Sequence, residues 1–105
     1  MDFDRHTLVL LRRPPDSPDF SDTELEELQA AHLAHLQAMR ERGVLAVAGP
    51  FDGPSDETLR GLCVYTVAPD EARRLAEQDP AIRARRMTLE VMTWLTPPGV
   101  EFAPA

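Results

Sequence analysis

The sequence predicts a single α+β domain in which four strands and two helices follow one another in the order β-α-β-β-α-β. Two observations lead to this prediction. Short apolar segments rich in Val and Leu alternate with two segments of helical periodicity. The chain has 105 residues, of which 43% are apolar, which suffices for one hydrophobic core and no more.

The first half of the chain predicts a strand, a loop and a long helix. Residues 7–11 form an apolar run that is long enough for a buried strand and too short for a helix. Three prolines make residues 12–20 an irregular loop. Ser21 and Glu24 then match a capping box, and Gly43 ends the helix as a C′ glycine would.

Within this helix, apolar residues recur at spacings of three and four, and a histidine lies among them. The stripe consists of Leu25, Leu28, His32, Leu36 and Met39. Such a stripe is typical of an amphipathic helix that packs on a sheet.

The second half of the chain predicts the remaining strands and the second helix. We expect a strand at 44–48 that is stopped by Gly49-Pro50, and then a turn-rich loop at 51–59. A strand at 61–67 follows, and after it a helix that begins at Pro69 and stops before Pro80. The chain is then expected to form a short arm at 81–86, a strand at 87–95 and a tail at 96–105. This order is that of the ferredoxin-like fold, with both helices on one face of a four-stranded antiparallel sheet. The tail is expected to be ordered only by a partner subunit.

Composition and charge exclude several classes of protein. The net charge of −7 argues against nucleic acid as a partner. The single cysteine, Cys63, cannot form an intramolecular disulfide, and no apolar run approaches the roughly 20 residues of a membrane-spanning helix. Because the first residues are acidic and lack an apolar signal segment, we expect a cytoplasmic protein.

The third strand has apolar residues on both of its faces, which predicts a homodimer. Leu62 and Val64 alternate with Cys63 and Tyr65. Two helices cover only one face of the sheet, so a second copy of the chain is the simplest cover for the other.

His32 and Asp79 are the first candidates for chemistry. The polar ring of His32 lies on an apolar stripe, where it must find a partner or cost stability. Asp79 is expected at the C-terminal end of a helix, where the helix dipole disfavours an anion. From spacing alone, a core histidine and a helix-ending Asp-Pro pair are the favoured interpretations of these two positions.

The other reactive side chains give weaker signals. His35 forms an i, i+3 pair with His32, a spacing that two metal ligands can share, but two histidines and one distant carboxylate do not predict a metal site. Its position off the stripe predicts a residue at the rim or surface. Cys63 is expected to be an unreactive core residue. No cofactor-binding motif is present in the sequence.

Several short patterns occur together along most of the chain. They are His32-Leu33 in the first helix, Gly43, Gly49-Pro50 after the second strand, Gly61 in the third, Glu71-Ala72 at the start of the second helix and Asp79-Pro80 at its end. In their order and spacing, the sequence resembles the YCII-related family over Leu8 to Trp94. That resemblance implies a dimeric α+β barrel.

The resemblance also implies a site. It assigns catalysis to His32 and Asp79, beside a pocket that Gly49 and Pro50 border. An acidic ligand would fit a protonated His32 together with Arg12 or Arg13, of which Arg12 is the predicted contact.

Two functions are compatible with such a site. The first is a cofactor-independent lyase or isomerase that uses general acid–base catalysis on a small phenolic or acidic substrate. The alternative is a non-catalytic binding or accessory domain. One family member eliminates chloride from a chlorinated hydroquinone. Because the loop at 12–20 and the tail at 96–105 depart from shorter members, no substrate is transferred to this chain.

Overall fold

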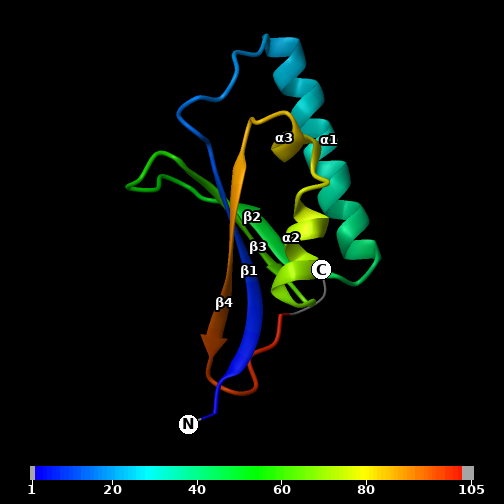
Figure 1. Cartoon of the computed structure of the whole chain (residues 1–105), viewed down its shortest axis with the longest axis vertical. Helices are drawn as coiled ribbons and strands as arrows, with labels where there is room; N and C mark the ends of the chain where they lie inside the picture. Colours follow the sequence, from blue (N-terminus) through cyan, green and yellow to red (C-terminus); the bar gives the residue numbers. More distant parts are fainter. Residues whose placement is uncertain (1, 103–105) are drawn as a thin grey trace.

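The computed structural model describes residues 2–102 and contains a four-stranded antiparallel sheet in the order β2-β3-β1-β4. The elements are β1 (Asp4–Arg12), α1 (Asp22–Glu41), β2 (Leu45–Pro50), β3 (Leu59–Tyr65), α2 (Pro69–Ala76), α3 (Pro80–Arg83) and β4 (Thr88–Thr96). The three helices lie against one face of the sheet (Figure 1). The predicted α+β, ferredoxin-like class is confirmed.

β1 and β2 extend beyond their predicted bounds, β3 begins and ends two residues earlier than predicted, and β4 lies one residue later. β1 pairs with β4 over its whole length, from Asp4 opposite Thr96 to Arg12 opposite Thr88. β2 includes Gly49 and Pro50, which the sequence predicted as its stop. Proline is tolerated there because β2 is an edge strand, where one row of backbone N–H groups has no partner strand.

Helix α1 begins and ends where its capping residues predict. The Ser21 hydroxyl accepts a hydrogen bond from the Glu24 backbone N–H, and the Glu24 carboxylate accepts one from the Ser21 backbone N–H. Arg42 is the C-cap, and Gly43 has φ 75°, a left-handed conformation that suits glycine. The capping box and the C-terminal glycine each depend on residues only a few positions apart, so the sequence predicts both ends of α1 well.

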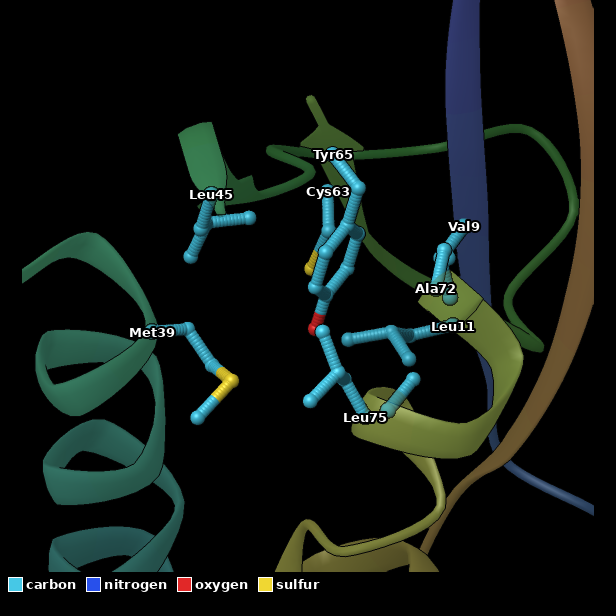
Figure 2. Packing of buried hydrophobic residues seen from close by; sticks show 9 residues of the cluster. Val9, Leu11, Met39, Leu45, Cys63, Tyr65, Ala72 and Leu75 are labelled. Carbon is cyan, nitrogen blue, oxygen red and sulfur yellow. The ribbon is translucent and has the colours of Figure 1, made fainter. Parts of the chain in front are cut away.

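The hydrophobic core lies between the sheet, the C-terminal end of α1 and α2. Figure 2 shows Met39 of α1 and Leu75 of α2 facing Cys63 and Tyr65 of β3. Nearer the start of α1, the predicted stripe is only partly buried: His32 is buried, whereas Leu25, Leu28 and Leu36 are half-buried. This part of the stripe lines a cavity.

The second predicted helix is two helices. α2 ends at Ala76, after which the N–H groups of Gln78 and Asp79 bond to carbonyls only three residues back. Pro80 has no N–H with which to continue, and it starts α3 instead. The predicted arm at 81–86 is therefore mostly α3 and the turn that ends it.

The tail returns along its own chain. The Gly99 N–H donates to the Asp4 carboxylate over 2.9 Å, and the Phe102 ring packs edge-on against His6 with centroids 5.6 Å apart. Residues 97–102 thus have contacts within one chain, and the expectation that a partner subunit orders the tail stays a prediction. Residues 103–105 of the predicted tail lie outside the described part.

Among the residues that the structure describes, no helix is both long and apolar enough to cross a membrane.

Replacing Gly61 with Ala should destabilise the protein by about 1–3 kcal/mol, because a buried overlap forces the backbone apart. A Cβ atom at this position would lie 2.8 Å from the Gly49 carbonyl oxygen of the neighbouring strand. Gly49→Ala is the matched control, since a Cβ there meets no atom within 4 Å. Urea unfolding checks this, and equal midpoints for the two variants would contradict it.

Candidate functional site

A cavity of about 540 Å³ lies between α1 and the sheet. Its apolar wall includes four leucines of α1, Leu25, Leu28, Leu33 and Leu36, and further residues from other elements, among them Leu11, Phe51, Leu62, Cys63 and Met87. Its polar side chains are those of Gln29, His32, Arg13, Arg60 and Arg86. A largely apolar cavity of this size with a few convergent polar groups is typical of a small-molecule site.

His32 and Asp79 meet in the structure although 47 residues separate them in the sequence. The His32 Nδ1–H donates to Asp79 Oδ2 over 2.6 Å, a short distance that is typical of a charge-assisted hydrogen bond. Both side chains are buried, with 9% of His32 and 3% of Asp79 exposed. The polar ring on the apolar stripe has thus found its partner.

The environment of Asp79 differs from the one that the sequence predicted. Asp79 is not the last residue of α2 but the N-cap of α3, and its Oδ1 accepts from the Ala81 backbone N–H over 2.9 Å. An N-cap favours an anion, so the expected unfavourable helix-end position is wrong. Each carboxylate oxygen has one donor, and this holds the side chain in one orientation.

The bond to Asp79 determines which nitrogen of His32 is left for chemistry. With the proton on Nδ1, the lone pair of a neutral imidazole lies on Nε2. His32 lines the cavity, and its Nε2 has no hydrogen-bond partner within residues 2–102. The arrangement can therefore accept a proton from a bound molecule and return it.

Of the predicted binding residues, Gly49 and Pro50 line the cavity and Arg12 does not. Arg12 donates to Asp56 over 2.9 Å and to Glu90 over 3.3 Å. Hydrogen bonds from Thr58 and then from Arg12 lower the pKa of Asp56 to about 2.

Arg13 lines the cavity in place of Arg12. Successive residues of a strand point to opposite faces, so the buried Val9 and Leu11 already assign the next position in phase, residue 13, to the helix side. This alternation could have identified Arg13 from the sequence. Arg86 also lines the cavity, and sequence reasoning missed it because it follows an irregular turn.

His35 and Cys63 play lesser parts. His35 is half-buried and is not among the residues that line the cavity. Burial lowers the pKa of His35, against the opposite effect of the nearby Asp79 charge. Cys63 lines the cavity, but burial raises the pKa of its thiol to about 12, so it is not a thiolate near neutral pH.

Within residues 2–102, no group of three or more His, Cys, Asp or Glu side chains is placed to hold a metal ion.

The sequence model of the YCII-related domain matches residues 7–95. Among solved structures, the chain is similar to 5-chloro-2-hydroxyhydroquinone dehydrochlorinase (TftG) from Burkholderia phenoliruptrix AC1100, in complex with 2,5-dihydroxybenzoquinone. The TM-score is 0.60 at 24% identity, over 85% of this chain and 92% of the other. No curated protein matches the chain.

Proposed function

Because the chain belongs to the YCII-related family, we propose that it is a lyase or isomerase in which His32 and Asp79 act on a small phenolic or acidic molecule. The observation that carries this proposal is the buried hydrogen bond between His32 Nδ1 and Asp79 on the wall of a cavity of about 540 Å³. It supports a general base whose tautomer is set before any ligand binds.

The proposed chemistry is proton transfer at His32 Nε2. The nitrogen accepts a proton from an O–H or C–H group of the substrate, and the released electron pair stays on the substrate. In an elimination, that pair forms a new double bond while the leaving group departs with its own bonding electrons. In an isomerisation, the imidazolium returns the proton to a different atom. Asp79 stabilises the imidazolium and keeps the ring in place.

The similar dehydrochlorinase supports the choice of substrate class. Its name describes elimination from a chlorinated hydroxyhydroquinone, and its bound molecule is a dihydroxybenzoquinone. A six-membered ring with a few polar substituents fits a cavity of about 540 Å³.

A screen of phenols, chlorinated hydroquinones, lactones and carboxylic acids tests the proposal. Thermal shift measures binding, and chromatography with chloride detection measures product. We expect at least one compound both to perturb the His32 ring resonances in NMR spectra and to be converted. Saturable binding without conversion would support a non-catalytic binding domain instead, and ligands that leave the His32 resonances unchanged would contradict the assigned site.

We also propose a homodimer that forms through the sheet face opposite the helices. Leu8 and Met92 lie opposite each other on this face, and both Met92 and Trp94 are exposed. Large exposed apolar side chains on a sheet face are typical of an interface.

The solution mass at low micromolar concentration should therefore be near twice the 11.7 kDa of one chain. Met92→Glu should give monomers, because a carboxylate buried between two sheets lacks a partner. Ala38→Glu, on the exposed side of α1, is the control and should stay dimeric. A folded wild-type monomer would contradict the proposal.

A further inference from the structure

The charged side chains that line the cavity, apart from His32, are all arginines. They are Arg13, Arg60 and Arg86, and within residues 2–102 no Asp or Glu contributes to the lining. The chain as a whole has 18 acidic and 11 basic residues, so a group of charged side chains that contains only cations is not expected by chance. The cavity is therefore positive inside an acidic protein.

Two pairs of consecutive arginines each contribute one residue to the cavity lining. Among the described residues, only the other arginine of each pair has a carboxylate partner. In the pair 12–13, Arg12 binds Asp56 and Glu90, whereas Arg13 has no carboxylate partner among residues 2–102. In the pair 85–86, Arg85 binds Asp16 over 2.8 Å, and in the described chain Arg86 binds no carboxylate. In each pair, the arginine outside the cavity is neutralised by the chain and the one that lines it is not.

The backbone places both unpaired arginines at the cavity. The Arg13 N–H donates to the Thr58 carbonyl over 2.8 Å, which continues the β1–β3 pairing past the end of the strand. Arg86 follows Arg85, whose φ of 63° turns the chain after α3, and the N–H groups of both bond back to α3 carbonyls. A non-glycine residue with positive φ is uncommon, and here it precedes a cavity residue.

Arg60 adds charge beside them. The register between β1 and β3 shifts between Leu11 and Arg12, so Arg60 is an extra residue in a bulge. Its guanidinium donates to the backbone carbonyls of Leu59 and Glu57, which hold it without neutralising it.

Arg13 gives the strongest indication that this group of arginines binds a ligand. Its Nε is buried and has no hydrogen-bond partner within the described chain. Burial, and then the positive charges of Arg86 and Arg60, lower the pKa of the Arg13 guanidinium. A buried cationic donor that has no acceptor destabilises the folded protein. An anion bound between these side chains would accept a hydrogen bond from this donor and remove that cost.

We propose that Arg13 and Arg86, beside Arg60, bind the carboxylate of an organic acid whose apolar part lies against Leu28 and Leu36 of α1. A guanidinium matches a carboxylate with two parallel hydrogen bonds. The leucine wall favours an organic acid over a small inorganic anion, which would leave that wall uncovered. This inference rests on the proposed function, since it names the substrate class of the site that contains His32.

The test compares benzoate with benzamide, which has the same shape and no charge. NMR titration of the folded protein should show that benzoate binds at least 10-fold more tightly. Arg13→Gln and Arg86→Gln should each weaken benzoate binding by about 10-fold or more, because each removes a charge-assisted hydrogen bond. Benzamide binding should change by less than twofold.

The neighbouring arginines provide matched controls. Arg12→Gln and Arg85→Gln remove the same charge from the chain one residue away, and each should change benzoate binding by less than twofold. Equal losses in all four variants would overturn the proposal, because the effect would then be one of overall charge. Equal affinity for benzoate and benzamide would also overturn it, as would phosphate that competes as tightly as benzoate.

The two proposals can fail separately. Turnover of neutral phenols that depends on His32, without any preference for benzoate, would contradict the carboxylate site alone. Full turnover in a His32 variant that binds benzoate through Arg13 and Arg86 would contradict the proposed base alone.

Discussion

Replacing His32 with Asn should lower the turnover of any converted substrate by about 10²–10⁴-fold, the usual contribution of a general base. The Asn amide can still donate to Asp79 Oδ2, which now accepts from Nδ1, so the buried carboxylate keeps a partner. What the variant lacks is Nε2, the ring nitrogen left for the cavity. The fold should therefore survive while proton transfer is lost.

His35→Asn is the matched control for this prediction. It removes the same group three residues along α1, from a position that does not line the cavity. Turnover should stay within about threefold of the wild type, and benzoate should bind to both variants. A folded His32→Asn protein with unchanged kcat would show that Nε2 does not take part.

Replacing Asp79 should separate its two roles. Asp79→Ala removes both the N-cap of α3 and the partner of His32, so we expect a loss of about 2–4 kcal/mol in the free energy of unfolding. Asp79→Asn should cost about 1 kcal/mol or less, because the amide oxygen can still accept from the Ala81 N–H.

The Asn variant should nevertheless be inactive. Its amide nitrogen would donate to His32 Nδ1, which moves the ring proton to Nε2 and removes the lone pair from the cavity. A loss of about 10²–10⁴-fold in kcat is expected from the wrong tautomer. The ¹⁵N shifts of the His32 ring report the tautomer directly, and urea unfolding gives the stability. An Asn variant with the wild-type tautomer and activity would show that Asp79 supports the fold only.

Both experiments concern the region of α3, which contributes to the stability of the fold and also positions the proposed base. The N-cap of this four-residue helix is also the partner of the base, and the turn that ends it leads to Arg86. A substitution that unwinds α3 would therefore disturb His32 and Arg86 together. Variants in this segment need a stability measurement beside every activity measurement.

Local signals account for what the sequence predicted correctly. The capping box at Ser21 and the left-handed Gly43 act within one turn of helix, so the bounds of α1 could be read without the fold. The histidine on an apolar stripe was a visible conflict between polarity and burial. It identified His32 as a residue that requires a partner.

Short-range patterns in the sequence predict the α+β class, the order of the four strands and the place of His32 on an apolar stripe, because periodicity, caps and prolines are properties of short segments. Asp79 was singled out for a helix-end position that is wrong, and the resemblance to the YCII-related family assigned it to the site. How these residues contact one another depends on the tertiary packing of the elements that carry them. The second predicted helix is divided into α2 and α3, which makes Asp79 an N-cap rather than a helix end, and the turn at Arg85 places Arg86 at the cavity. Contacts across tens of residues depend on how whole elements pack, and no local pattern encodes that.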